Sequence, residues 1–170
     1  MPIHQATPED AARLSQLACD TYREHFAAIW RPARLDAYLR SEFAEPVLQR
    51  ALAATDQAWY LMAGTGGALD GYAKVNWHRT EPLTDRTGAH LQKIYFHANA
   101  TGRGLGERML AHVQDIARTR GDAWLWLQVL GSNERARRFY LRQGFQSLGT
   151  SIFSADIGPI AMHTLARDLE

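Results

Sequence analysis

A turn that carries three glycines constrains this chain more than any other stretch. Leu91 to Phe96 reads as a strand, and after it come Gly102, Gly104 and Gly106 and then an amphipathic helical pattern. Glycine lets the backbone approach a ligand closely, and the first turn of a helix has N–H groups without internal partners. A strand, a glycine turn and a helix N-terminus in this order predict an anion site, and a phosphate or pyrophosphate suits it.

Two nucleotide-binding motifs compete for this turn. A P-loop requires G-x-x-x-x-G-K-[ST], and no such string occurs in the chain. A dinucleotide-binding fingerprint places its glycines at i, i+2 and i+5, whereas here they stand at i, i+2 and i+4. Asp122 stands near the distance expected of a ribose-binding acid, so an oxidoreductase that binds NAD(P) remains an alternative.

Length and composition favour a single domain over residues 1–170, because 46% of the residues are hydrophobic and 22% are charged. No stretch approaches the ~18 apolar residues of a membrane span, so no membrane partner is expected. The first ten residues lack the basic and apolar regions of a secretory signal. The single cysteine, Cys19, excludes an internal disulfide framework, and the cytoplasm is the expected compartment.

Positive charge is concentrated in residues 101–142, which hold eight arginines against four acids. Such an excess suits a multiply anionic cofactor. The whole chain has a net charge of only +1, which does not favour a nucleic-acid partner. The seven histidines form no H-E-x-x-H motif and one cysteine forms no C-x-x-C pair, so no metal site is predicted.

Proline positions predict three helices in the first third of the chain, because proline is favoured in the first turn of a helix. These helices begin near Pro8, Pro32 and Pro46. Three strands are expected next, over 58–63, 72–77 and 89–96. A glycine-rich loop separates the first two strands and a polar loop over 78–88 separates the last two, so the three pair antiparallel in sequence order.

The second half of the chain predicts one parallel crossover. A helix over 105–120 precedes a nearly all-apolar strand over 123–130, which is typical of a central strand buried on both faces. A right-handed crossover makes that strand parallel to the strand at 89–96. The last elements expected are a helix over 133–144 and strands over 145–153 and 159–167. Together these elements predict an α+β fold, with a mixed, mainly antiparallel sheet and helices on both faces.

Two segments resemble the GCN5-related N-acetyltransferase (GNAT) superfamily. The first looks like its [QR]-x-x-G-x-[GA] signature and reads Thr101-Gly102-Arg103-Gly104-Leu105-Gly106, with Thr101 in place of a long Gln or Arg. The second is similar to the family's N-x-x-A-x-x-x-Y-x-x-x-G-F block, with Asn133, Ala136, Tyr140, Gly144 and Phe145 in register. The two blocks stand in the family's order, and the resemblance covers residues 57–150 closely.

The resemblance implies a three-layer α-β-α acetyltransferase fold. It also implies transfer of an acetyl group from acetyl-CoA, the acyl-donor cosubstrate, to a primary amine of a small molecule or peptide by direct attack. The aromatic stretch from Tyr22 to Phe26 together with K-I-Y-F is similar to the bacterial spermidine/spermine-type branch, which makes a polyamine one candidate. Dimers are frequent among similar proteins, so a homodimer is one open arrangement.

The resemblance further implies how acetyl-CoA is held. The amides of the turn, from Thr101 to Gly106, would bind the pyrophosphate. The backbone groups of Tyr95 and Phe96, at the end of the strand before the turn, would bind the pantetheine arm as an added strand does. Asn133 and Tyr140 of the second block are assigned to the same site.

The resemblance assigns two catalytic groups. The backbone N–H of Phe96 would donate to the developing oxyanion. Tyr140 occupies the family's general-acid position, where a phenol of pKa ~10 would protonate a thiolate whose thiol has a pKa of ~8.5. The alternative for Tyr140 is a buried aromatic with a packing role only.

The general base is the open question. Many family members have a Glu where this chain has Gln92, which cannot titrate in a useful range. Strand alternation places His90 on the same face, and a histidine of pKa about 6–7 suits the task. A water chain ending near His78, Glu81 or Asp85 is the alternative. Gln92 also motivates a rival function, a non-catalytic acyl-CoA sensor or binding partner.

Overall fold

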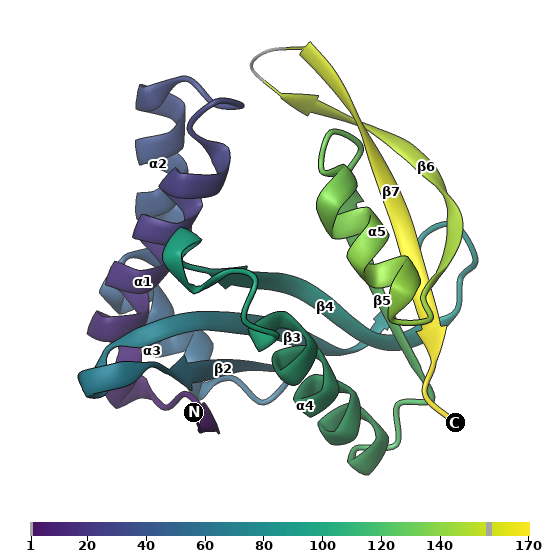
Figure 1. Ribbon diagram of the computed structural model, residues 1–170, viewed down its shortest axis with the longest axis horizontal. Coiled ribbons are helices and arrows are strands. Elements are labelled where there is room, and N and C mark those ends of the chain that lie inside the picture. The colour runs from purple at the N-terminus through teal and green to yellow at the C-terminus, as the bar shows by residue number, and fades with distance from the viewer. Residues whose placement is uncertain (1, 156–157) are drawn as a thin grey trace.

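The computed structural model describes residues 2–155 and 158–170 and shows one mixed sheet within them (Figure 1). Its seven strands lie in the order β1-β2-β3-β4-β5-β7-β6. The strands are β1 (Ile3–Gln5), β2 (Gln57–Ala63), β3 (Leu69–Thr80), β4 (Thr87–Phe96), β5 (Trp124–Leu130), β6 (Gln146–Ala155) and β7 (Gly158–Asp168). Only β4 and β5 pair in parallel, so the predicted mainly antiparallel sheet with one parallel pair is confirmed.

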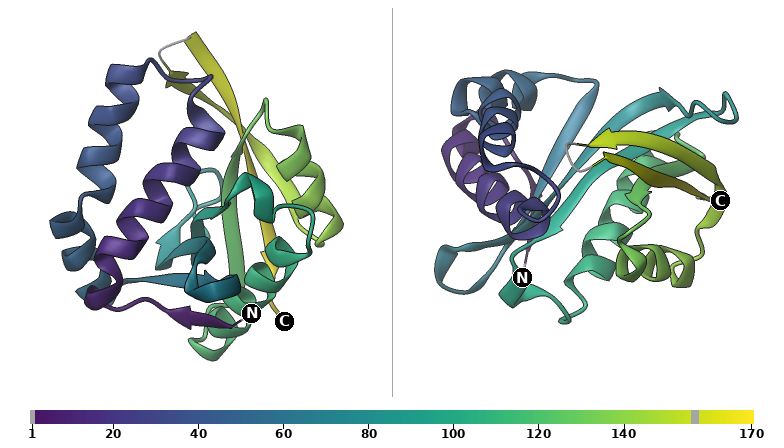
Figure 2. Two further views of the ribbon diagram at one scale, coloured as in Figure 1. Left: turned by 60° about the vertical axis from the view of Figure 1, so that its left-hand side comes forward. Right: turned by 90° about the horizontal axis from the view of Figure 1, so that it is seen from above.

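Helices cover both faces of the sheet, and the predicted three layers are confirmed (Figure 2). One face carries α1 (Ala11–Phe26), α2 (Pro32–Phe43) and α3 (Glu45–Ala53). The other face carries α4 (Leu105–Thr119) and α5 (Glu134–Arg142). Short 3-10 helices are η1 (Pro8–Asp10), η2 (Thr65–Gly67) and η3 (Ala98–Ala100). None of the helices in the described residues is long and apolar enough to cross a membrane.

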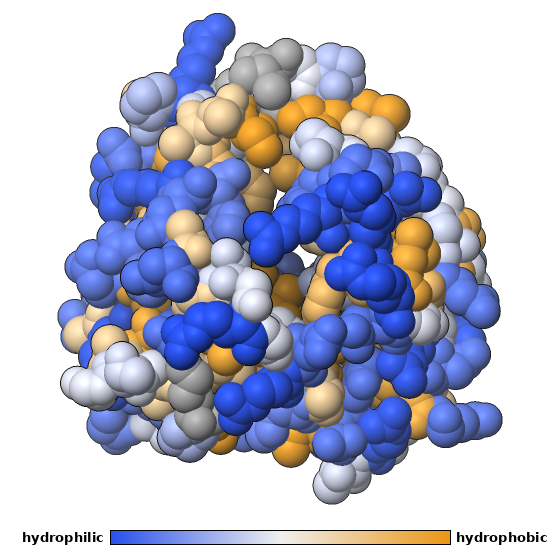
Figure 3. All heavy atoms as spheres, in the orientation of Figure 1, coloured by the Kyte–Doolittle hydropathy of each residue, from blue (hydrophilic) through white to orange (hydrophobic). Residues whose placement is uncertain are grey.

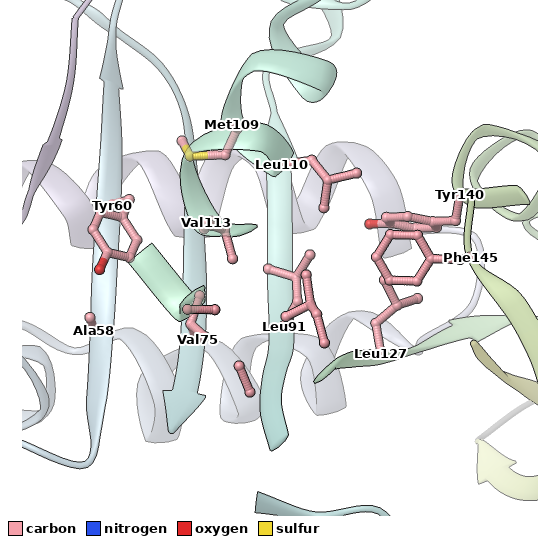
Figure 4. Packing of buried hydrophobic residues seen from close by; sticks show 14 of the residues in the cluster. Ala58, Tyr60, Val75, Leu91, Met109, Leu110, Val113, Leu127, Tyr140 and Phe145 are labelled. Carbon is pink, nitrogen blue, oxygen red and sulfur yellow. The ribbon is translucent and has the colours of Figure 1, made fainter. Parts of the chain in front are cut away.

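Side chains of the central strands divide between two hydrophobic cores, because successive residues of a strand point to opposite faces. Trp59 and Leu61 of β2 join the core beneath α1, α2 and α3. Tyr60 and Met62 join the core beneath α4 and α5. Figure 4 shows this second core, with Val113 of α4 pointing toward the strands.

The prolines stand at helix starts as predicted. Pro32 is the first residue of α2, and Pro46 is the second of α3. Pro8 opens η1, and α1 follows it without a break. Ahead of η1 the N–H of Thr7 donates to the Asp10 carboxylate at 3.0 Å, so local sequence fixes this N-terminus.

The polar loop expected over 78–88 is wrong at both ends. β3 continues to Thr80 and β4 begins at Thr87, and the hydroxyls of these two residues lie 3.1 Å apart across the pair. The remaining six residues turn around Glu81, whose carboxylate accepts the N–H groups of Leu83 and Thr84 at 2.9 Å. Strand ends that lie at the exposed margin of a sheet carry polar side chains, so composition alone reads them as loop.

β4 and β5 diverge after a short parallel stretch. Among the described residues they pair only at Ala89 with Leu125 and at His90 with Trp126. The rest of β4 leaves its β5 side open as it runs toward the glycine turn (Figure 1). The fold therefore presents a gap between two strands, with the predicted anion site at its end.

Candidate active site

The glycine turn between η3 and α4 has a backbone that requires glycine at two positions. Gly102 has φ of 79° and Gly104 has φ of 71°, values that side chains with a Cβ rarely adopt. A Cβ added at either residue would meet nothing within 4 Å, so the space beside the turn is open. The first bond within α4 runs from the Arg108 N–H to the Gly104 carbonyl, 3.2 Å away. The N–H groups between these residues therefore have no partner within the helix and could bind an anion.

Two polar side chains fasten this turn to earlier elements. Thr101 donates its hydroxyl to the carbonyl of Ala98 at 2.9 Å, so it closes η3. The Arg103 guanidinium lies 3.7 Å from the Asp70 carboxylate at the start of β3, and its side chain is half-exposed. These side chains hold the turn in place. The Thr101 N–H is itself bonded to the Ala98 carbonyl at 3.4 Å, so the predicted amide donors are reduced to those from Gly102 to Gly106.

The backbone of β4 faces the gap at alternate residues. The His97 N–H donates to the Asp70 carbonyl of β3 at 2.9 Å. Because the backbone groups of successive residues in a strand point to opposite sides, those of Ile94 and Phe96 point away from β3, toward the gap. The Tyr95 carbonyl oxygen faces β3, since it would lie 2.6 Å from a Cβ built on Gly71. The expectation that the Tyr95 backbone shares this role with Phe96 is therefore corrected to Ile94 and Phe96.

The end of α1 reaches the same strand end. His25 Nε2 lies 3.1 Å from the Phe96 carbonyl oxygen. The Glu24 carboxylate accepts the Ala98 N–H at 2.9 Å and lies 3.2 Å from His97 Nδ1. These contacts join residues 71 to 74 positions apart in the chain, so no local pattern predicted Glu24 or His25.

Tyr140 of α5 lies in the core beneath the gap. It is 6% exposed, and its ring centroid lies 5.1 Å from that of Phe139 and 5.5 Å from that of Phe145. Figure 4 shows its hydroxyl directed toward the side of Leu91 and Leu110. Burial raises the pKa of Tyr140 well above that of a free phenol, so the hydroxyl keeps its proton throughout the physiological range.

Asn133 begins α5, as predicted. Its side-chain oxygen accepts the N–H of Ala136 at 3.1 Å, which is the bond of a helix N-cap. The side chain is therefore committed to the backbone of its own helix. Any contact that Asn133 makes with a cofactor would come from its remaining groups.

His90 and Gln92 share one partner on β3. The Asn76 amide donates to the Gln92 side-chain oxygen at 2.9 Å and lies 3.5 Å from His90 Nδ1. The His90 ring stacks on Trp126 with centroids 3.9 Å apart and an interplanar angle of 10°. These contacts bring the predicted base candidate and the missing carboxylate position together.

The titration expected of His90 is wrong. Burial first, and then the positive charges of Lys74, Arg79 and Lys93, lower the pKa of His90 to about 4. The ring is therefore uncharged at neutral pH and holds a proton only weakly. No sequence pattern shows this, because the cause is the set of neighbours that the sheet assembles.

The residues proposed to end a water chain lie at the other end of β4 from the glycine turn. Nδ1 of His78 lies 3.0 Å from the Asp122 carboxylate. The Glu81 carboxylate accepts backbone N–H groups of the loop that follows it. Asp85 has φ of 57° in that same loop. His78 lies near the end of β3, whereas Glu81 and Asp85 belong to the connection between β3 and β4, a full strand length from the turn.

An aromatic cage around Lys93 was not anticipated. Its Nζ lies 3.1 Å from the Tyr38 hydroxyl. The same atom lies 5.3 to 5.7 Å from the ring centroids of Tyr22, Tyr38 and Phe43. Lys93 itself is 5% exposed. The three aromatic residues belong to α1 and α2, so only tertiary packing brings them to β4.

The surface is hollowed between the α1 side of the molecule and α5, and the rim of the hollow is mostly hydrophilic (Figure 3). On the helical side, the Trp30 ring after α1 lies 6.4 Å from that of Phe153 in β6. Within the described residues, no group of three or more His, Cys, Asp or Glu side chains is placed to hold a metal ion.

Comparison with known proteins adds a family. A model of the acetyltransferase (GNAT) family matches residues 15–145. An uncharacterised N-acetyltransferase of Lactobacillus delbrueckii subsp. lactis is 23% identical over 152 residues, which cover 89% of this chain and 87% of that protein. An uncharacterised N-acetyltransferase of Mycobacterium bovis is 32% identical over 148 residues, covering 84% and 83%.

Solved structures share the fold at low identity. The PaiA N-acetyltransferase from Thermoplasma acidophilum, solved in complex with coenzyme A, matches with a TM-score of 0.73 and 17% identity over 99% of each chain. An N-acetyltransferase from Staphylococcus aureus Mu50 matches with a TM-score of 0.74 and 16% identity, covering 99% of this chain and 97% of that one.

Proposed function

The chain belongs to the GNAT acetyltransferase family, and from this we propose that it transfers the acetyl group of acetyl-CoA directly to a primary amine of a small molecule or a peptide. The observation that carries the proposal is the gap between β4 and β5, which ends at the open glycine turn. A thioester arm fits between two diverging strands, and a pyrophosphate fits the free amides beyond them.

The residues present fit acetyl-CoA, which supplies the activated acetyl group when bound. The amides from Gly102 to Gly106 would hold the pyrophosphate, because no Cβ obstructs Gly102 or Gly104. The backbone groups of Ile94 would pair with the amides of the pantetheine arm, because alternation turns them toward the gap, and the Phe96 N–H would face the acetyl end of that arm.

Two residues of the chain are assigned to the reaction. The Phe96 N–H would donate to the acetyl carbonyl oxygen and so stabilise the charge that develops there. Tyr140 would give the proton that the departing sulfur requires, and its raised pKa keeps that proton in place beforehand. The low pKa of His90 argues against its use as the base. His78, Glu81 and Asp85 lie at the end of β4 away from the glycine turn, where His78 contacts Asp122 and Glu81 binds its own loop.

Neither rival function is favoured. The curated relatives described above are N-acetyltransferases, which argues against a sensor without catalysis. A dinucleotide-binding oxidoreductase would need Asp122 near the glycine turn. Asp122 lies beyond the far end of α4, about 20 Å along a helix of 15 residues, and contacts His78.

An amine panel tests the proposal. Purified protein is mixed with acetyl-CoA and polyamines, amino acids or peptides with free N-termini, and released CoA thiol is measured. We expect release with at least one class of amine. Binding of acetyl-CoA without release for any amine would support the sensor, and tight NAD(P) binding without CoA binding would support the oxidoreductase. Light scattering on the same sample tests the homodimer.

A further inference from the structure

Lysine is confined to one place in this protein. Of the 19 basic side chains, only Lys74 and Lys93 are lysines and the other 17 are arginines. These two residues are direct cross-strand partners, Lys74 on β3 and Lys93 on β4. Lysine differs from arginine in that its ammonium can lose a proton when it is buried. A titratable amine is therefore available at this one position in the sheet.

Neither lysine forms a close ion pair with a carboxylate in the part of the chain that the structure describes, although the Glu42 carboxylate acts on both from a greater distance. None of the ion pairs found within the described residues involves Lys74 or Lys93. Lys74 Nζ instead lies 5.3 Å from the ring centroid of Trp59 and is half-buried. Lys93 Nζ lies in the aromatic cage of Tyr22, Tyr38 and Phe43, almost fully buried. Two like charges opposite one another in an apolar setting destabilise their charged forms.

The surroundings of Lys93 lower the pKa of its amine. Burial lowers its pKa to about 8, with Lys74 adding to the effect and the Glu42 carboxylate opposing it. Burial and Arg79 also lower the pKa of Lys74. The titratable groups that face Lys93 are Tyr22 of α1, Tyr38 and Glu42 of α2, Lys74 of β3 and His90 of β4. An appreciable fraction of Lys93 is thus neutral at mildly alkaline pH.

Lys93 stands beside the position where the expected carboxylate base is missing. The pairing of β3 with β4 shifts by one residue between Lys74–Lys93 and Val75–Leu91, so Gln92 is the extra residue of a β-bulge. A bulge re-aims the side chains next to it, and such bulges are common beside active sites. Three residues further on, the Phe96 backbone faces the gap where the acetyl group is proposed to lie. The cage therefore lies on the α1 and α2 face of β4, the strand whose far end lines the proposed reaction site.

We propose that Lys93 is the general base of this acetyl transfer. The inference rests on the proposed function and names the group that removes the acceptor's proton. Neutral Nζ of Lys93 takes one proton from the acceptor ammonium, and the freed lone pair forms the N–C bond to the acetyl carbonyl carbon. The C–S bond breaks with its electron pair on sulfur, which receives a proton from Tyr140.

The remaining protons balance through the same residues. The acceptor nitrogen loses its second proton as it becomes an amide, and that proton replaces the one that Tyr140 gave up. Lys93 returns its proton to water along the Tyr38 hydroxyl, which lies 3.1 Å from Nζ and belongs to a half-buried residue. The Tyr22 hydroxyl donates to the same Tyr38 oxygen at 3.3 Å, which leaves the Tyr38 proton free to pass to water. No oxidant, metal or further reactant is required.

Nuclear magnetic resonance tests the state of the amine directly. Because the chain has only two lysines, ¹³C-lysine labelling gives two side-chain Cε signals, and Lys74→Met assigns them. We expect the Lys93 signal to inflect near pH 8. In Lys74→Met the inflection should rise by roughly one unit, since a like charge has been removed. Inflections above pH 10 for both lysines would overturn the proposal without any activity measurement.

Kinetics test the role. With a weakly basic acceptor amine, kcat/KM should fall on the acidic side with an apparent pKa near 8, and Lys74→Met should move this limb upward by the same amount as in the titration. Lys93→Met and Lys93→Arg should each lower kcat/KM by ~100-fold or more, because neither can accept the proton. The affinity for acetyl-CoA should be unchanged. Arg50→Met, at an exposed residue of α3, is the control for loss of one cation.

The outcomes distinguish a failure of the role of Lys93 from a failure of the proposed acetyl transfer. If the wild-type protein releases no CoA with any amine, the proposed function fails. If wild-type and Lys93→Met proteins turn over alike with the same pH profile, only the role of Lys93 is refuted. Thermal melting of each variant shows whether a loss of activity reflects unfolding, and the wild-type titration stands independently of the variants.

Discussion

Placing a carboxylate on the glycine turn is the sharpest test of the cofactor site. In Gly104→Glu, an acid stands where the pyrophosphate of CoA is proposed to bind. The structure offers a matched control at Gly66 in η2, whose φ of 66° is close to the 71° of Gly104. A Cβ added at either residue meets nothing within 4 Å, so neither variant creates a clash. Gly66→Glu therefore reproduces the backbone strain and the added charge in the connection between β2 and β3, outside the glycine turn.

The expected magnitudes follow from these geometries. A residue with a Cβ in the left-handed region costs about 1–2 kcal/mol, which for a chain of this size lowers Tm by roughly 2–8 °C in both variants. A carboxylate at roughly 6 Å from a phosphate charge, at an effective dielectric constant of about 20, repels it by about 3 kcal/mol. That repulsion alone weakens binding ~100-fold, and the second phosphate increases the loss.

Calorimetry with CoA and thermal melting of the three proteins measure both effects. We expect Gly66→Glu to bind CoA as the wild-type protein does, although its Tm falls. We expect Gly104→Glu to show a similar fall in Tm and at least a 100-fold higher Kd. Equal CoA affinity in two folded variants would show that the pyrophosphate does not occupy this turn. A parallel loss in both variants would trace the effect to stability.

Three further predictions concern single side chains. Tyr140→Phe keeps the buried ring and removes the hydroxyl, so kcat should fall ~100-fold or more with little change in CoA affinity, and full activity would leave Tyr140 a packing role only. The folded-state pKa of His90 is about 4, below the unfolded value of ~6.5, so the unfolded chain binds more protons between those values. His90 therefore contributes up to about 3 kcal/mol to the free energy of unfolding above pH 6.5, and this contribution is lost as the pH falls toward 4. Urea unfolding at several pH values should show a smaller decrease in stability for His90→Gln than for the wild-type protein. Asn133→Ala removes the cap bond to Ala136 and should lower the free energy of unfolding by about 1 kcal/mol, and an unchanged value would mean that solvent replaces the cap.

Local patterns in the sequence were sufficient for most of the architecture. Prolines at helix starts, apolar alternation in the strands and the glycine turn each depend on residues close together in the chain, so each could be recognised without a structure. The run from Trp124 to Leu130 showed by its continuous apolar character that it lies inside the sheet. The errors fell at the ends of β3 and β4, where exposed strand residues are polar.

The working parts of the site depend on contacts between distant residues. The pKa of His90 is set by burial and by Lys74, Arg79 and Lys93, which β3 and β4 bring together. The aromatic cage around Lys93 includes Tyr38 of α2, which lies 55 positions earlier in the chain. Such neighbours leave no periodic signal, because the sequence records what each residue is and the packing of helices on the sheet decides what surrounds it. Burial and nearby charge set proton affinity, so the candidate base could be identified only once the tertiary fold had placed these groups together.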